Sequence, residues 1–311
     1  MSKQDQFEEQ LRLQAAGVNR RSFLKQAGFT GLGLAGATMV GSRLGLMDKL
    51  PGATAIGLAS SGVEAAGITD IDILNFALNL EYLEAEFYTV ATTGKRISDF
   101  GIGITGQGTP GPTHGGNGVD FSTIEDGPDA DGAGDLDTRE FSRKLRAIAQ
   151  EITYDEQQHV ILLRAALGAN AIAKPAINLN ALGLGFKNFQ EFLVLARAFE
   201  DTGVSAYGGA APLITSKDYL SAGVRIGLTE AMHAANLRLL VAENYVKTAA
   251  LDSKDVLPPP SGTKYFTVDT HALAVVRTPS QVLSIVFHNS APGTYEGGFF
   301  PNGVNGQIRT V

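Results

Sequence analysis

Two stretches of the chain, "YDEQQHV" and "LTEAMHA", place a glutamate three residues before a histidine. The pairs are Glu156 with His159 and Glu230 with His233. Residues at positions i and i+3 share one face of a helix, so each pair can reach a common point inside a helix bundle. Carboxylate and imidazole groups together suit divalent metal ions. The spacing therefore predicts that both pairs ligate metal at one site, whereas solvated helix-surface charges are the alternative interpretation.

Two further helical segments each carry a glutamate followed seven residues later by a tyrosine, Glu81 with Tyr88 and Glu200 with Tyr207. The chain thus repeats the order Glu…Tyr, Glu-x-x-His. Four carboxylates would balance two divalent cations, which makes burial of the charges tolerable. We expect Glu81 and Glu200 to bridge the two ions, and each tyrosine to hydrogen-bond a carboxylate on a neighbouring helix.

The choice of Glu81 as the ligand of the first helix is open, because Glu84 lies one turn further on nearly the same face. We favour Glu81 because its spacing to Tyr88 matches that of Glu200 to Tyr207, and we place Glu84 beside the ligands. Asp155 or Glu151 could contact a ligand or line a path for cations, and Tyr88, Tyr207 or Tyr154 could relay a proton or an electron. By default we expect four nearby acidic residues on helix surfaces, namely Glu86, Glu151, Asp155 and Asp201.

The composition limits the other kinds of site. The chain has no cysteine, which excludes thiol catalysis, disulfides and cysteine-ligated iron. Its net charge of −7 and the lack of a long basic run argue against a nucleic-acid or anionic-membrane partner. Of the five histidines, His114, His271 and His288 have no acidic or histidine partner at ligand spacing, so we expect them to be surface or hydrogen-bonding residues.

Helical periodicity predicts four long helices, and their lengths favour a bundle. The first runs from Thr69 to about Thr93, the second from about Asp137 to Gly168, the third starts at Asn188, and the fourth runs from about Thr215 to Ala250. Residues 95–136 are rich in glycine and lack periodicity, so we predict an inserted surface loop there.

The two ends of the chain differ from this helical region. The C-terminal extension, residues 257–311, begins with "LPPPSG". The rest of it is predicted to form short strands or an extended tail over the bundle, with a short helix in "HALAVVRTPSQVLSIV" as the alternative. Near the start, "NRRSFLK" precedes a weakly apolar, glycine-rich run. This resembles a twin-arginine export signal, with "ATA" as the expected cleavage site and "ASS" as an alternative, so we assign residues 1–55 to a signal peptide.

The helical region, residues 69–250, resembles the ferritin-like superfamily of carboxylate-bridged di-iron or di-manganese bundles. The segments "LNFALNLEYLEAEFY", "DEQQHV", "AFEDTGVSAYGGAAP" and "TEAMHAANLR" carry the resemblance. Within the superfamily the chain is most similar to exported bacterial proteins related to plant desiccation-associated proteins. The resemblance implies a mainly α, ferritin-like four-helix bundle with a di-metal site and a long connection between helices two and three. The signal, the loop and the tail argue against a hollow storage shell.

The function that follows is that of an exported metalloprotein with two iron or manganese ions. It would act in oxidative stress as an oxidoreductase of the ferroxidase, peroxidase or catalase kind, reacting with dioxygen or peroxide or oxidising Fe(II). The alternatives are a non-catalytic metal-binding or desiccation-protective envelope protein, and a scaffold that has lost its metal. The expected partners are the metal ions, the oxidant and the twin-arginine translocation machinery, with a periplasmic or other exported location. Assembly into a homo-oligomer stays open.

Overall fold

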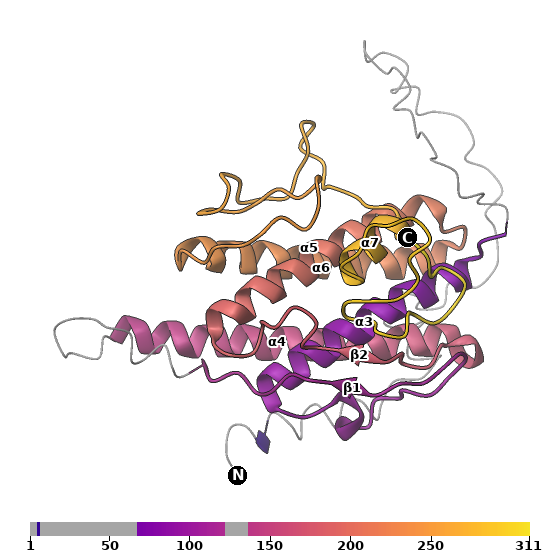
Figure 1. The fold of residues 1–311 in the computed structure, drawn as a ribbon, viewed down its shortest axis with the longest axis horizontal. Coiled ribbons are helices and arrows are strands. Elements are labelled where there is room, and N and C mark those ends of the chain that lie inside the picture. The colour runs from indigo at the N-terminus through magenta and orange to yellow at the C-terminus, as the bar shows by residue number, and fades with distance from the viewer. Residues whose placement is uncertain (1–4, 7–66, 122–135) are drawn as a thin grey trace, which may run out of the picture.

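The computed structural model describes residues 5–6, 67–121 and 136–311, so nearly all of the signal peptide predicted at 1–55 lies outside it. The fold is mainly α, as predicted (Figure 1). Within the described residues, no helix is both long and apolar enough to cross a membrane. The four long helices are α3 (Asp70–Thr93), α4 (Leu136–Leu167), α5 (Phe189–Ala210) and α6 (Lys217–Glu243).

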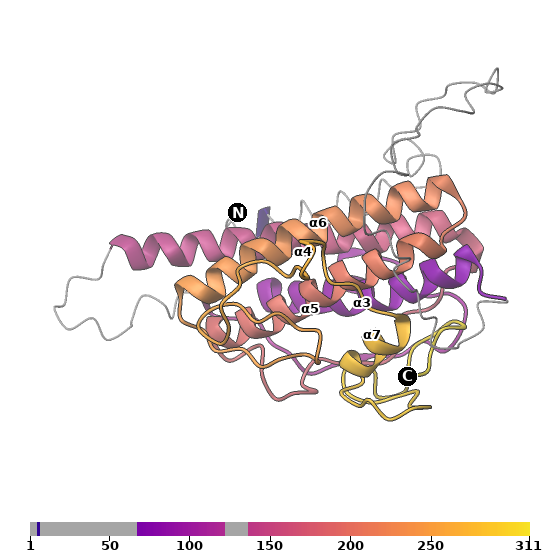
Figure 2. The ribbon, with the colours of Figure 1, turned by 90° about the horizontal axis from the view of Figure 1, so that it is seen from above.

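The helices pack as two hairpins, α3 with α4 and α5 with α6 (Figures 1 and 2). The first turns of α4 extend beyond the other helices. Helix α3 is buried on every face from Leu78 to Ala91, since α4, α5 and the tail surround it. A helix buried all round is the central element of its bundle. The three glutamates of its "EYLEAE" segment are therefore all inside the protein.

Polar residues fix the starts of three of these helices. The side chain of Thr69 accepts a hydrogen bond from the Asp72 amide in a capping box, and Asn188 accepts one from the Glu191 amide, both as predicted. The fourth helix differs from the prediction. Ser216 caps it, and it ends at Glu243 rather than Ala250, where the chain leaves the helix and Tyr245 takes a φ of 52°.

The glycine-rich segment between α3 and α4 is not simply a surface loop. Its described part buries several apolar side chains: Ile97, Phe100, Ile102, Val119 and Phe121. It contains the 3-10 turn η1 (Ile97–Phe100) and the strand β1 (Thr113–His114), which pairs in parallel with β2 (Ile177–Asn178). A Cβ atom at Gly106 or Gly111 would collide with the backbone at Ala171 or Ala176. These glycines thus permit close packing, which sequence periodicity does not reveal.

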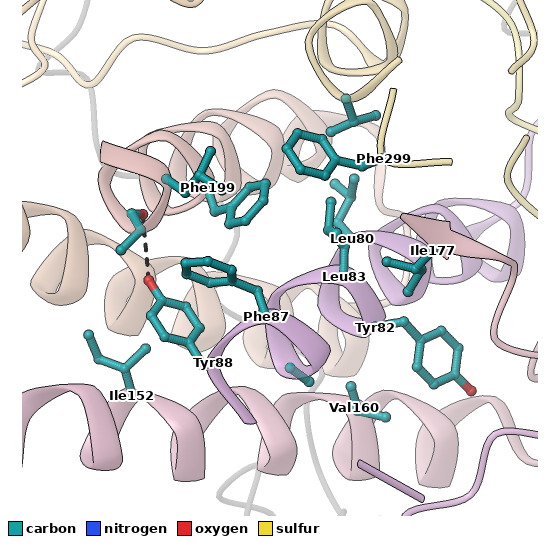
Figure 3. Packing of buried hydrophobic residues seen from close by; sticks show 14 of the residues in the cluster. Leu80, Tyr82, Leu83, Phe87, Tyr88, Ile152, Val160, Ile177, Phe199 and Phe299 are labelled. Atoms are coloured by element: carbon teal, nitrogen blue, oxygen red, sulfur yellow. Dashed lines mark hydrogen bonds between the residues drawn. The ribbon is translucent and has the colours of Figure 1, made fainter. Parts of the chain in front are cut away.

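The C-terminal extension packs on the bundle. The segment expected as a strand at "SQVLSIVFH" is instead the helix α7 (Pro279–Val286), with Thr278 and Gln281 forming its capping box, so the short-helix alternative is correct. Further along, Phe299 and Phe300 are buried in the main core. Figure 3 shows Phe299 beside Phe199 of α5, and the ring centroids lie 5.0 Å apart. The tail is thereby part of the bundle's hydrophobic core.

Candidate metal centre

The six residues singled out as ligands come together inside the bundle. They form two groups of four, each with one ligand atom per residue and all such atoms within 4.8 Å of one another. All six are buried, and we call them the Glu/His cluster. The first group contains Glu81, Glu156, His159 and Glu230, and the second contains Glu156, Glu200, Glu230 and His233.

The residues shared by the two groups are Glu156 and Glu230, not Glu81 and Glu200. The expectation that Glu81 and Glu200 would bridge two ions was therefore wrong in its geometry. Nδ1 of His159 lies 3.2 Å from Glu81 and 3.3 Å from Glu230. The glutamates of the two Glu-x-x-His motifs lie where the two hairpins meet, so each contacts ligands from both hairpins. Glu81 and Glu200 each reach one end of the cluster only.

The two tyrosines cross between the hairpins. The Tyr207 hydroxyl donates a hydrogen bond to Glu81, and the Tyr88 hydroxyl lies close enough to Glu200 for that carboxylate to raise its pKa. The Tyr88 hydroxyl also lies 3.5 Å from the carbonyl oxygen of Ala196, the contact drawn in Figure 3. Burial, together with the adjacent carboxylates, raises the pKa of both tyrosines well above the usual value. Both stay neutral, and Tyr207 donates to a carboxylate on another helix.

Glu84 is a further buried carboxyl beside the cluster, and it belongs to neither group of four. Its neighbour across the bundle is Gly203 of α5. A Cβ atom at Gly203 would collide with Glu230 and would come within 3.5 Å of Glu84. Burial, and then the charges of Glu230 and Glu156, raise the pKa of Glu84 well above its usual value. This environment favours the neutral form of Glu84, and Gly203 provides the space that the carboxyl groups occupy.

Charge in the cluster is unevenly distributed. Burial would lower the pKa of His159, but the carboxylates of Glu156 and Glu81 raise it well above its usual value. Burial acts against ionisation of Glu156, yet His159 and His233 lower its pKa. Burial raises the pKa of Glu81 to about 7 and that of Glu230 further. Without cations other than the two histidines, the cluster must take up protons to limit repulsion between its carboxylates.

Several carboxylate oxygens of the cluster are buried without a hydrogen-bond donor among the described residues. They belong to Glu81, Glu156, Glu200 and Glu230, and both oxygens of Glu230 are among them. A buried polar oxygen without a partner is costly, and a bound divalent cation would satisfy such oxygens. Glutamate and histidine are donors that iron and manganese accept. The residues present therefore fit a metal site.

Asp155 supports one end of the cluster. Its carboxylate lies 3.0 Å from Nε2 of His233, while Nδ1 of His233 lies 3.2 Å from Glu200 and 3.3 Å from Glu156. A carboxylate on the outer nitrogen of a histidine fixes the tautomer in which the inner nitrogen is free to bind metal. Of the two acidic residues considered for this role, Asp155 has it, and Glu151 is exposed.

Two acidic residues expected on helix surfaces are buried instead. Glu86 lies 3.7 Å from the ammonium group of Lys174. Asp201 forms ion pairs with Arg197 at 2.7 Å and Arg238 at 2.8 Å. Each pairs with a basic residue that is itself buried, so these acids join the bundle to neighbouring segments. Arg238 also donates to the carbonyl oxygens of Val256, Lys264 and Tyr265, which ties the tail to α6.

The remaining histidines are outside the cluster. His114, His271 and His288 are exposed, as expected. Tyr154, considered as a relay, is only half-buried on α4.

Comparison with known proteins bears on the family. A search of curated proteins found no match. The ferritin-like domain family, however, matches residues 69–243, which span α3 to α6 and include the whole Glu/His cluster. Because this match covers more than half of the chain and the helices form the corresponding bundle, the protein belongs to the ferritin-like family.

Proposed function

We propose that the Glu/His cluster holds two divalent metal ions, iron or manganese, and that the protein is a redox metalloprotein. The observation that carries the proposal is the pair of four-residue groups that share Glu156 and Glu230. The shared glutamates would serve both ions, whereas Glu81 with His159 and Glu200 with His233 would serve one ion each. Four ionised carboxylates would offset the charge of two divalent ions, and protonated Glu84 would add none.

The surrounding side chains would prepare this site for chemistry. Tyr207 donates a hydrogen bond to Glu81, which reaches only one end of the cluster, and this bond fixes the position of the other carboxylate oxygen. Asp155 orients His233. The buried carboxyl group of Glu84 lies beside Glu230, where it would be placed to exchange a proton with a reduced oxidant.

When bound, the metal ions supply electrons to dioxygen or peroxide. Alternatively, the site would oxidise Fe(II) that is supplied as a substrate. Catalysis of this kind would make the protein an oxidoreductase active in oxidative stress. In both reactions the glutamates of the Glu/His cluster would bind and position the cations.

Metal analysis tests the site. We expect close to two iron or manganese ions per chain in the purified protein, and loss of both in a variant combining Glu230→Ala and His233→Ala. Glu151→Gln is the matched control, because Glu151 is an exposed glutamate on α4. Absence of metal from the unmodified protein would refute the proposal.

Turnover separates the redox function from metal binding alone. We expect Glu156→Ala to abolish peroxide-dependent or Fe(II)-dependent turnover, since Glu156 belongs to both groups. If the unmodified protein carries its full metal content but reacts with neither compound, the non-catalytic metal-binding or desiccation-protective function replaces the redox one.

We also propose that the protein is exported through the twin-arginine machinery to the periplasm or beyond. The support is the "NRRSFLK" segment followed by a weakly apolar run. Replacing Arg20 and Arg21 together with lysine should leave the protein inside the cell with its metal content unchanged. Export at the normal level in that variant would contradict the proposal.

A further inference from the structure

A cavity of about 30 Å³ lies between the four helices, beside the Glu/His cluster and toward the turn that joins α5 to α6. Its wall includes Phe76, Ala77 and Leu80 of α3, Leu163 of α4, Tyr207 of α5 and Gly223 of α6. Nothing in the proposed metal site requires this space. Its wall reaches the surface near Ile214, Tyr219 and Gly223, which are only half-buried, so a small molecule can enter from solvent there.

The cavity adjoins the cluster directly. Ala77 precedes Glu81 by four residues, and Leu163 follows His159 by four, so each lies one helical turn, about 6 Å, from the cluster. The ring of Tyr207 forms part of the wall, and its hydroxyl donates to Glu81. Glycines on α6 leave room for that ring, since a Cβ atom at Gly227 would approach the Tyr207 Cβ to 3.0 Å.

The lining of the cavity selects against polar molecules. All its residues are aliphatic, aromatic or glycine, and the side-chain hydroxyl groups among them are that of Tyr207, which is directed at Glu81, and that of Tyr219. Water or hydrogen peroxide would lose hydrogen bonds on entering, and cations would lose their hydration shells. A single water needs about 10–15 Å³ on this measure, so the space suits a molecule of two or three such volumes. A small, uncharged, apolar molecule meets both conditions.

We propose that this cavity binds dioxygen and passes it along the Tyr207 ring to the Glu81 end of the cluster. The role in supply rests on the redox function proposed above, whereas the binding itself does not. The proposal assigns this route to dioxygen rather than to peroxide, because the almost entirely apolar lining compensates few of the hydrogen bonds that peroxide would lose on entering. Cations and protons must then reach the cluster elsewhere, and Asp155, whose side chain is 28% exposed, marks such a place.

Gly223 provides the variant and its control. A Cβ atom at this position would lie 3.7 Å from Ile214 and 3.9 Å from Tyr207, which is ordinary contact, so Gly223→Ala should fit without displacing either. The longer side chain of Gly223→Leu must extend into the cavity and fill it. If Gly223→Leu fails to fold, Ala166→Val fills the same cavity from α4.

The direct test uses dissolved dioxygen, which is paramagnetic, and the full-length protein prepared in Zn(II), which is diamagnetic. Methyl signals of Leu80 and Leu163, which are buried and line the cavity, should relax several-fold faster under dioxygen pressure than those of Leu145 and Ala149, which are buried on α4 away from it. The difference should persist in Gly223→Ala and disappear in Gly223→Leu. Equal relaxation at both sets of methyl groups would overturn the proposal whether or not metal binds.

The supply role is tested on iron-loaded protein. Gly223→Leu should raise the KM for dioxygen several-fold while metal content and the KM for peroxide stay unchanged. An unchanged KM for dioxygen in a variant that has lost dioxygen-induced relaxation would show that the cavity is not on the supply route. Failure of the unmodified protein to bind metal would instead refute the metal site and leave the relaxation result standing.

Discussion

Gly203 stands three residues after Glu200 on α5, at the spacing at which α4 and α6 carry their histidines. On α3 the same spacing after Glu81 brings Glu84. The four helices thus place histidine, histidine, glutamic acid and glycine at equivalent positions. The glycine leaves space for the carboxyl groups of Glu230 and Glu84. A residue without a side chain therefore determines how the carboxylates are arranged.

Gly203→Ala should weaken metal binding, because the new methyl group would push the Glu230 carboxylate out of place. Outer residues that orient metal ligands typically contribute about 10–100-fold in affinity, and we expect a loss in that range by competition with a chelator. Gly223→Ala, whose Cβ would make only ordinary contacts, should leave metal affinity unchanged. Equal affinity in Gly203→Ala and the unmodified protein would contradict this account.

Single residues also show what the sequence could reveal. The six cluster residues and the two tyrosines were predicted because their spacing repeats along the chain. The role of Gly203 could not be predicted, because it depends on the lack of a side chain next to Glu230 and Glu84, which lie on other helices. The burial of Glu86 and Asp201 was missed because their partners Lys174 and Arg238 are 88 and 37 residues away in the sequence.

Among the elements, the boundaries of the helices were predicted best and the packing of the connections worst. Capping residues and periodicity are local signals, so α3 and α5 begin where the sequence indicates. The segment after α3 and the tail lack periodicity, yet both are held by scattered apolar residues and by buried ion pairs. One such pair joins Arg277, which is fully buried, to Asp252 through two hydrogen bonds of 2.8 and 2.7 Å.

Asp252→Ala should destabilise the docked tail, because it leaves the Arg277 guanidinium buried without a counter-charge. Breaking a buried pair in this way costs about 3–5 kcal/mol, and the partial exposure of Asp252 favours the lower end. Adding Arg277→Met should recover part of the loss. Proteolysis of the tail and thermal unfolding measure the stability of both variants. If Asp252→Ala is as stable as the unmodified protein, the Asp252–Arg277 pair does not hold the tail in place.

The same pair has a defined pH dependence. Hydrogen bonds from Arg277 hold the pKa of Asp252 below its usual value. Its contribution is thus complete above the unfolded-state pKa, about 3.9, and is lost as pH falls through the lower folded-state pKa. The difference in stability between Asp252→Ala and the unmodified protein should therefore be constant from neutral pH to about 4 and shrink below that. Denaturant unfolding across this range checks it, and a difference that persists in strong acid would contradict it.

At the scale of the whole molecule, metal should stabilise the fold. The cluster concentrates carboxyl groups that repel or must be protonated, and bound cations remove that cost. Ligand at 100 times its dissociation constant adds about 2.7 kcal/mol, so metal loading should raise the Tm by several degrees and a chelator should reverse it.

Glu230→Gln separates this effect from general stabilisation. Burial and neighbouring charges raise the pKa of Glu230 well above its usual value and so favour its neutral form in the absence of metal. The neutral glutamine should therefore leave the metal-free Tm nearly unchanged while abolishing the rise on metal addition. A large fall in the metal-free Tm would indicate that the glutamate supports the fold itself.

Each helical hairpin supplies three residues of one group of four and borrows the fourth. The α3–α4 hairpin provides Glu81, Glu156 and His159, and takes Glu230 from the other; the α5–α6 hairpin provides Glu200, Glu230 and His233, and takes Glu156. The α5–α6 connection is short, whereas residues 94–135 separate α3 from α4. Since closing a short loop is entropically cheaper and local contacts form fastest, the α5–α6 hairpin should assemble first during folding. Neither hairpin completes a group alone, so full metal affinity arises only in the last stage, when the two meet.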